Sequence, residues 1–207
     1  MTIFSKTKST ATKPLLQKHP DFGDITFINN PSSRSLRLSV EPFKGLQVKM
    51  PPRFSHKKAL VFIESKREWI MSALKGMEET ENLSIKFFSE TPQPKPQEIR
   101  HSLSTRLSEI AQLHGFEYGK VSIRNQKSRW GSCSSANNIS LNQKLYFLPP
   151  HLRDYVLLHE LAHTEQKNHS PAFWSILHKV LGRVATQRMR RELRQYAFLF
   201  YPPPKTT

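Results

Sequence analysis

Cysteine is almost absent from this sequence of 207 residues, which holds only Cys133. A single cysteine cannot form an intramolecular disulfide, so we expect a fold that needs no oxidising compartment. No stretch approaches the roughly 18 consecutive apolar residues that span a bilayer, and the N-terminal residues lack the apolar run of a secretory signal. We therefore expect a cytoplasmic protein with no membrane-spanning segment.

Acidic residues are also scarce, with 16 Asp and Glu against 32 Lys and Arg, which gives a formal net charge of +16. This balance favours polyanionic partners such as nucleic acid. The predicted C-terminal helix is especially basic, because it sets five arginines against Glu192: Arg183, Arg188, Arg190, Arg191 and Arg194. Such a run is either a solvated helix face or an element that contacts phosphates, and the sequence leaves both open.

Three prolines lie close together at Pro92, Pro94 and Pro96, and this spacing predicts a semi-rigid linker over residues 91–98. The linker would separate an N-terminal module, residues 21–90, from a larger domain, residues 99–198. A disordered basic tail is expected over residues 1–20, and a second tail over residues 199–207.

The N-terminal module is predicted to combine a small antiparallel sheet with one helix. Apolar residues alternate over 36–40 and 46–50, and the segment between them reads as a hairpin turn. Helical spacing of apolar residues follows over about 55–77.

The larger domain mixes helices and short strands. Apolar spacing from Ile99 to Ile110 predicts an amphipathic helix that ends near Gly115. Val121 and Ile123, and then Ile139 and Leu141, alternate with polar neighbours as in strands. Three further helices are expected over about 152–167, 172–181 and 184–198. The fold class is therefore α+β.

The chemistry is concentrated in the run His159-Glu160-Leu161-Ala162-His163. Two histidines at i and i+4 lie on one helical face, about 5–6 Å apart, so two imidazoles can reach one metal ion. Glu160 would lie beside that ion, where a carboxylate can take a proton from a zinc-bound water and return it to the leaving amine. On the same helix, Tyr155 would border the site.

A catalytic zinc ion usually takes three protein ligands and leaves the fourth place for water. His169, six residues after His163, supplies the third donor in sequence terms, and the full pattern is HExxHxxxxxH. The sequence therefore predicts one zinc ion per chain, held by His159, His163 and His169, with Glu160 as general base.

These motifs, together with Arg129-Trp130-Gly131-Ser132-Cys133 and His169-Ser170-Pro171, resemble the YgjP-like metallopeptidase family, and more distantly the SprT-like and WLM proteases. The resemblance runs from about residue 25 to residue 198. It implies a minimal, gluzincin-like zincin catalytic domain preceded by the antiparallel β plus helix module. It implies no settled substrate.

The resemblance further implies that the strand after Cys133 edges the active-site cleft, so that Ser140, Leu141 and Asn142 would pair with an extended peptide. Amide hydrolysis needs a donor for the developing oxyanion, and Arg129, Asn142 and Tyr146 are the candidates. Trp130 is either part of this cleft or simply a core anchor. Cys133 is either an inert thiol or an inhibitory metal ligand.

Two functions from different classes remain open at this point. The first is a zinc endopeptidase acting on polypeptide. The second is a nucleic-acid-binding protein with a structural zinc ion. A combination of the two is a protease that DNA recruits, as in SprT-like proteins. Glu160 favours the endopeptidase, because a structural site has no use for a carboxylate beside the ion. The sequence leaves the oligomeric state open.

Overall fold

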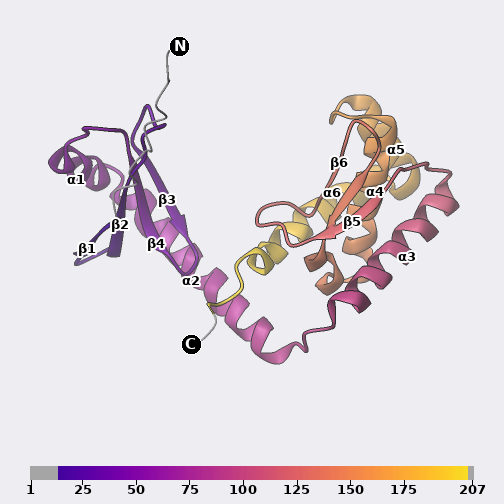
Figure 1. Ribbon diagram of the computed structural model, residues 1–207, viewed down its shortest axis with the longest axis horizontal. Coiled ribbons are helices and arrows are strands. Elements are labelled where there is room, and N and C mark those ends of the chain that lie inside the picture. The colour runs from indigo at the N-terminus through magenta and orange to yellow at the C-terminus, as the bar shows by residue number, and fades with distance from the viewer. Residues whose placement is uncertain (1–13, 205–207) are drawn as a thin grey trace, which may run out of the picture. The chain divides into compact units, whose positions relative to one another are not determined.

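The computed structural model describes residues 14–204, and it divides the chain into two compact units (Figure 1). Among the described residues, unit 1 covers the chain up to Lys86 together with Pro203 and Pro204, and unit 2 covers Phe87–Pro202. Both units combine helices with a small sheet, which confirms the α+β class. No helix within the described residues is long and apolar enough to cross a membrane.

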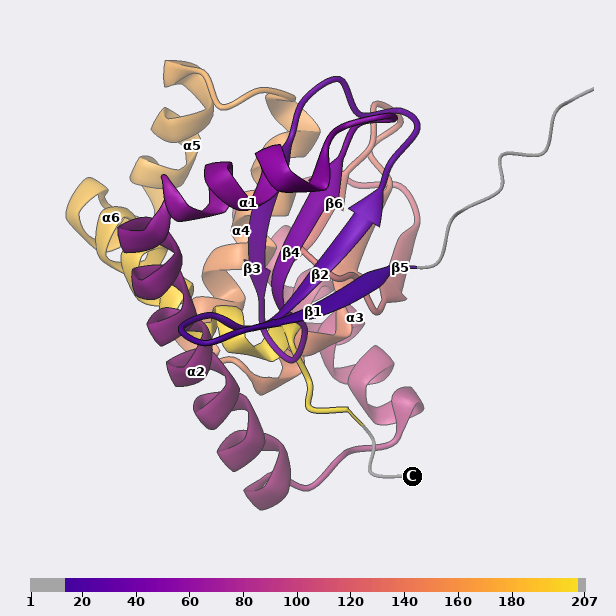
Figure 2. The same cartoon turned by 90° about the vertical axis from the view of Figure 1, so that its left-hand side faces the viewer.

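Unit 1 is a four-stranded sheet with helices packed against it. Its elements are β1 (Leu15–His19), β2 (Gly23–Asn29), β3 (Arg37–Glu41), β4 (Gly45–Met50), α1 (His56–Glu64) and the first part of α2 (Arg67–Glu90). Figure 2 shows the four strands side by side in the order β1-β2-β4-β3. The predicted hairpin is present as β3 and β4, but β2 pairs with β4 in parallel, so the expected purely antiparallel sheet is wrong at this pair.

The parallel pair builds the core of unit 1. Its register sets Ile25 beside Leu46 and Phe27 beside Val48, so all four side chains share one face of the sheet. Each of these side chains is almost completely buried, together with Ile63 of α1 and Ile70 of α2. Local alternation predicts this buried face, whereas the strand order depends on pairing across 20 residues of chain, which no local pattern encodes.

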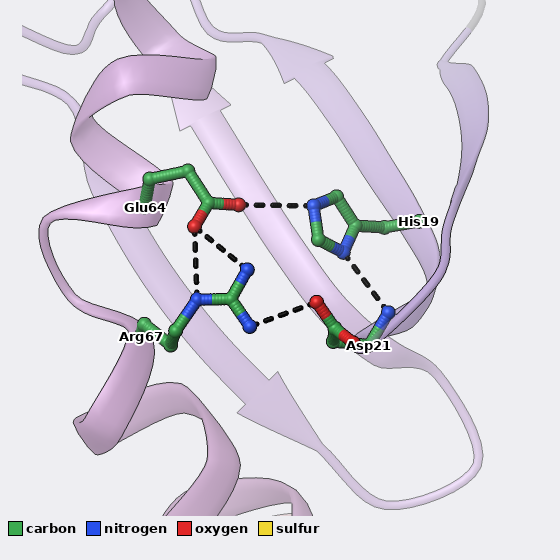
Figure 3. Close-up of polar contacts among 4 residues, drawn as sticks. All are labelled: His19, Asp21, Glu64 and Arg67. Atoms are coloured by element: carbon green, nitrogen blue, oxygen red, sulfur yellow. Dashed lines mark hydrogen bonds and ion pairs between the residues drawn. The ribbon is translucent and has the colours of Figure 1, made fainter.

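Strand β1 corrects the prediction of a disordered tail over residues 1–20, because Leu15–His19 pairs with β2 along its whole length. Residues 1–13 of that predicted tail lie outside the described residues. A polar network just after β1 ties it to the helices (Figure 3): His19 Nε2 lies 3.0 Å from Glu64 Oε1, and Arg67 donates to both Asp21 and Glu64. The backbone N–H of Asp21 donates to His19 Nδ1, so the ring proton sits on Nε2 and is donated to Glu64.

The helices around the predicted linker also differ from expectation. The single helix expected over 55–77 is two helices that break at Ser65, whose hydroxyl donates to the carbonyl of Phe62 at 2.7 Å. The second, α2, then continues to Glu90. Of the linker predicted over 91–98, only Thr91–Lys95 is irregular, because Pro96 takes the first helical position, where no amide donor is needed.

Unit 2 holds three strands and four α-helices. Its elements are the end of α2, then α3 (Pro96–His114), β5 (Val121–Arg124), β6 (Gly131–Cys133), β7 (Ile139–Asn142), the 3₁₀ segment η1 (Gln143–Phe147), α4 (Pro150–Glu165), α5 (Pro171–Leu181), α6 (Arg183–Glu192) and the 3₁₀ segment η2 (Leu193–Phe200). The strands run in the order β5-β7-β6, with β5 parallel and β6 antiparallel to β7.

Helix α4 lies in the centre of this unit, and its burial fixes the orientation of the motif that it carries. Leu157, Leu161 and Ala162 are completely buried, in one cluster with Ile139 and Leu141 of β7 and Leu103 and Leu107 of α3. Because one side of α4 is anchored in this core, its other side presents the histidines in a fixed direction.

The tail expected over 199–207 is wrong at its first two residues, and residues 205–207 of it lie outside the described residues. Leu199 is completely buried in the core of unit 2, and the ring of Phe200 lies 4.5 Å from that of Trp130. Leu199 and Phe200 both belong to η2. The burial of the apolar Leu199 side chain offsets the conformational entropy lost when this segment is ordered. The position of Leu199 in the sequence did not predict this burial.

The predicted end of α3 at Gly115 is confirmed, since Gly115 adopts the left-handed conformation with φ 72°.

We expect Gly115→Ala to lower the free energy of unfolding by about 1 kcal/mol, because a Cβ is disfavoured in the left-handed conformation. Gly76→Ala is the matched control. Gly76 lies inside α2 with no atom within 4 Å of an added Cβ, so alanine should stabilise the chain. Urea unfolding measures the free energy of unfolding of both variants. Equal changes of the same sign in the two variants would contradict the assignment of Gly115 as the helix cap.

Candidate active site

Helix α4 and the start of α5 bring three histidines together. His159 and His163 lie one turn apart on α4, and His169 stands just before α5, so that one nitrogen from each ring lies within 4.8 Å of the others. The Nε2 atoms of His159 and His169 are 3.1 Å apart. Two imidazole nitrogens bound to one tetrahedral zinc ion are about 3.3 Å apart, so the spacing of this pair fits zinc.

Burial favours the neutral form of His159 and His169, which is the form that a metal ligand needs. Burial lowers the pKa of His159 to about 3, with further lowering by His163, His169 and Arg190. The pKa of His169 is also lowered, mainly by burial and then by His163 and Arg190. His163 Nδ1 donates to the carbonyl of Gln166 at 2.9 Å, which leaves the lone pair of its Nε2 directed at the other two rings.

Two aromatic residues of α5 hold the imidazoles in place. Phe173 is completely buried, and its ring stacks on His163 and meets the edges of His159 and His169, with centroid distances of 4.5–4.9 Å. Trp174 stacks on His169 at 5.8 Å. These rings restrict the motion of the three donors before any metal binds, so they do more than pack one helix against the next.

Glu160 is a buried carboxylate beside the histidines. Its side chain lies 5% exposed, and Oε2 has no hydrogen-bond partner among the described residues. Burial raises the pKa of Glu160 to about 7, against a lowering influence of Arg129. Gly131 of β6 makes room for this side chain, since a Cβ there would lie 2.7 Å from both Cγ and Oε1 of Glu160. An acid held at this pKa can accept and release a proton near neutral pH.

A cavity of about 310 Å³ opens onto Glu160 and His159. Besides those two side chains it is lined by the following residues: Arg129, Trp130, Gly131, Tyr155, Val156, Arg190 and Leu193. The structure thus brings the predicted Arg129 and Tyr155 to the site and adds Arg190, which the sequence did not single out as a site residue. Arg190 lies over the ring of Trp174, 5.1 Å from its centroid. That contact joins α6 to α5. The sequence could not show which of the five arginines near the C-terminus makes it.

Two of the predicted oxyanion donors have other positions. The side-chain amide of Asn142 donates to the carbonyls of Gln126 and Arg129, and its oxygen accepts from the backbone N–H of Lys144, so the completely buried Asn142 is fully used in holding a loop. Tyr146 packs edge-on against Phe147, 5.6 Å between centroids, and is not among the residues that line the cavity. Of the candidates, Arg129 alone lies at the site.

The expected pairing of a peptide with Ser140, Leu141 and Asn142 is also wrong. These residues form β7, which is the central strand, with β5 on one edge and β6 on the other. Leu141 points into the core, and Ser140 Oγ is buried without a hydrogen-bond partner among the described residues. A central strand has no free backbone groups to offer a peptide.

The free edge beside α4 belongs to β6 instead. The N–H of Asn142 donates to the carbonyl of Trp130, so the alternation of an antiparallel ladder turns Trp130 and Ser132 towards β7. The backbone groups of Gly131 and Cys133 consequently face away from the sheet. Because Gly131 lies against Glu160, this edge borders the metal site.

Cys133 is not part of the cluster of potential metal ligands, which consists of the three histidines among the described residues. Burial raises the pKa of its thiol, and Lys167 only partly opposes this. Lys167 Nζ also donates to the carbonyl of Ser134 at 2.9 Å, which ties the segment after α4 to the turn between β6 and β7. These observations favour the inert thiol of the two alternatives.

Solved structures of metallopeptidases are similar to part of the chain. The crystal structure of the metallopeptidase zymogen of Pyrococcus abyssi abylysin is 26% identical in sequence over 45% of this chain and 92% of its own, with a TM-score of 0.41. The corresponding zymogen of Methanocaldococcus jannaschii jannalysin is 22% identical over 45% of this chain and 94% of its own, with a TM-score of 0.42.

Among curated proteins, the comparison found no match. The family model of the YgjP-like metallopeptidase domain, in contrast, matches residues 94–196, which span α3 to α6 and contain every residue of the site described above. This second unit of the chain belongs to the YgjP-like metallopeptidase family.

Proposed function

We propose that this metallopeptidase domain holds one zinc ion on His159, His163 and His169 and hydrolyses internal peptide bonds of extended polypeptides, with Glu160 as general base. The observation that carries the proposal is the joint geometry of donors and base. Three imidazole nitrogens converge within 4.8 Å, and a buried carboxylate with a pKa of about 7 lies beside them at the wall of a cavity.

His159, His163 and His169 would hold the zinc ion, which would supply a Lewis acid for the substrate carbonyl and would make water more acidic. Glu160 orients the attacking water through its unpartnered oxygen and accepts a proton from it. The same carboxyl group then donates this proton to the amine that leaves when the C–N bond breaks. A buried acid with a pKa of about 7 suits both transfers, because neither protonation state is strongly disfavoured near neutral pH.

Three side chains around the cavity can stabilise the oxyanion that develops on the carbonyl: Arg129, Tyr155 and Arg190. Burial raises the pKa of the Tyr155 hydroxyl, so it stays protonated and remains a donor at neutral pH. The two guanidinium groups are permanently charged. Arg129 keeps its predicted role in this proposal, and Tyr155 and Arg190 replace Tyr146 and Asn142.

The substrate would lie along the free edge of β6, where the backbone of Gly131 and Cys133 can pair with an extended peptide. Such pairing recognises the main chain and places few demands on sequence, which suits unfolded protein as a substrate. It would also set the scissile bond beside Glu160, because Gly131 is the residue of β6 that touches this side chain.

A structural zinc site in a nucleic-acid-binding protein is the alternative that the composition suggests. Structural zinc usually has four protein ligands. Within residues 14–204 the cluster provides three, and the next carboxylate, Glu160, lines a cavity. This arrangement supports a catalytic site.

The test combines metal analysis with proteolysis. Wild-type protein is expected to contain one zinc ion per chain and to cleave unfolded casein, and His163→Ala should lose both properties because one of three ligands is removed. His114→Ala, an exposed histidine at the end of α3, is the matched control and should keep both. A peptide blocked at both ends, analysed by mass spectrometry, distinguishes internal cleavage from trimming of the termini.

Each failure identifies a different error. Zinc that is bound but accompanied by no cleavage, with or without added DNA, would support the structural alternative. Protein without metal would contradict the ligand assignment. Cleavage that appears only with DNA would support the recruited protease.

A further inference from the structure

The face of the unit 2 sheet that points away from α4 is polar. Val121, Ile123, Ile139 and Leu141 point inwards to the core of this unit. Their neighbours point to the opposite face, where the strand register aligns Ser122 of β5, Ser140 of β7 and Ser132 of β6 in one row. Of the residues that line this face, Arg129 alone also has a role in the chemistry proposed above, and the serine row has none.

A concavity of about 620 Å³ covers this serine row. Arg124 at the end of β5 lines it, as do Lys127 and Arg129 of the loop between β5 and β6. The lining includes no Asp, Glu or aromatic residue among those that the structure describes. Its volume lies in the range of sites that hold molecules larger than a single ion.

The positive charges of Arg124 and Lys127 in this concavity have no acidic partner among the described residues, whereas Arg129 also acts on Glu160. Arg124, Lys127 and Arg129 are exposed, and none of them forms a salt bridge in the part of the chain that the structure describes. From Tyr118 to Arg153 the sequence contains six Lys and Arg and no Asp or Glu. This contrasts with Arg106 on α3, which pairs with Asp154 and Glu109. An anion would therefore meet unopposed cations here.

Hydrogen bonds from Asn142 and Lys144 hold the loop that carries Lys127 and Arg129. Asn142 holds it by hydrogen bonds to the carbonyls of Gln126 and Arg129, at 2.9 and 2.8 Å. The buried Lys144 donates to Asn125 Oδ1 at 2.6 Å and to the carbonyl of Gln126 at 3.1 Å. A loop held at three points loses little conformational entropy when a ligand binds to it.

We propose that this outer face of the β5-β7-β6 sheet binds the phosphodiester backbone of a nucleic-acid strand. Arginine, lysine and serine are the side chains that commonly contact phosphate oxygens. Because the described lining offers no aromatic platform for base stacking, binding should be independent of base sequence and strongly dependent on salt. The site differs from the arginine run of α6, which the composition alone had suggested.

The experiment measures binding of fluorescent oligonucleotides of about 20 nucleotides, single-stranded and duplex, over a series of salt concentrations. Arg124→Ala with Lys127→Ala should weaken binding about tenfold near 100 mM salt and reduce the slope of log Kd against log salt by about 1.5 to 2, because two phosphate contacts are lost. Arg129 is left intact because it also lines the cavity at Glu160. An unchanged urea unfolding midpoint shows that the variant is folded.

Two matched pairs control for net charge. Lys57→Ala with Lys58→Ala removes two exposed lysines from α1, and its affinity should stay within about twofold of wild type. Arg188→Ala with Arg191→Ala removes two exposed arginines from α6 and should weaken binding less than the sheet-face pair does. Polyglutamate should compete much less well than unlabelled oligonucleotide at equal charge.

Binding of either the single strand or the duplex with this order of effects supports the proposal, and the two arms show which form is preferred. The proposal is overturned if the sheet-face pair binds as well as wild type or if the α6 pair has the larger effect. Equal competition by polyglutamate would also overturn it, since the surface would then attract any polyanion.

Discussion

Glu160→Gln is expected to lower the rate of peptide hydrolysis by about 10³-fold while the protein still binds one zinc ion. Glutamine has almost the same size as glutamate, so it can occupy the space beside Gly131, but its amide cannot accept the proton of water. The three histidines are untouched, and Phe173 still holds their rings. Cleavage of a blocked peptide and metal analysis on the same preparation measure the two properties together.

Glu165→Gln is the matched control for this variant, because Glu165 is an exposed glutamate at the end of the same helix. It should keep both activity and zinc. A Glu160→Gln protein that still turned over substrate would show that another group is the base. Loss of zinc from it would mean that Glu160 supports the metal site and not the proton transfer.

The raised pKa of Glu160 also predicts how pH affects the metal-free protein. Burial disfavours the ionised carboxylate in the fold, so the side chain has a pKa of about 7 there and an ordinary, lower value when the chain is unfolded. The fold is thus relatively more stable below the unfolded pKa and loses this stability as pH rises towards 7. In the absence of metal, Glu160→Gln should therefore unfold at a higher temperature than wild type at pH 8 but not at pH 4.

Gly131→Ala should have the second largest effect, a loss of about 10²-fold in hydrolysis, although it adds one methyl group outside the metal ligands. The added Cβ would lie 2.7–2.8 Å from Cγ, Cδ and Oε1 of Glu160, closer than atoms can approach. The backbone of Gly131 has no positive φ, so alanine is not strained there, and the carboxyl group is what must move. Zinc content should remain one per chain.

Ser132→Ala, the neighbouring residue on the opposite face of the sheet, controls for a general disturbance of β6 and should leave hydrolysis unchanged. The double variant Gly131→Ala with Glu160→Gln gives a sharper comparison. If the methyl group acts only by displacing the base, the double variant is no slower than Glu160→Gln alone. Full additivity of the two losses would show that Gly131 matters for another reason, such as pairing with the substrate.

The metal site could be predicted from sequence because its geometry is local. A helix places residues four apart on one face, which pairs His159 with His163. His169 follows only six residues later, so the spacing in the sequence was enough to predict the three ligands. The end of α3 at Gly115 is local in the same sense. Each of these features depends on the conformation of fewer than a dozen successive residues.

Other parts depend on contacts between distant segments. Alternation identified β5 and β7 but not the order in which the strands pair, and this is why Ser140 to Asn142 were wrongly expected at a free edge. Strand β1 could not be predicted because Leu15 and Leu16 are exposed and the strand exists through pairing with β2. Arg190 reaches the site through α6, about 20 residues after the last ligand. No local pattern distinguishes it from Arg188 or Arg191.

The hydrogen bond from His163 to the carbonyl of Gln166 has a consequence for how this site can change over generations. Its acceptor is an atom that all amino acids possess, so no substitution at position 166 can delete it. The insertion or removal of one residue between 163 and 166 would displace it, and the imidazole would lose the partner that fixes its proton. We therefore expect this short stretch to tolerate drift in its side chains but to keep its length.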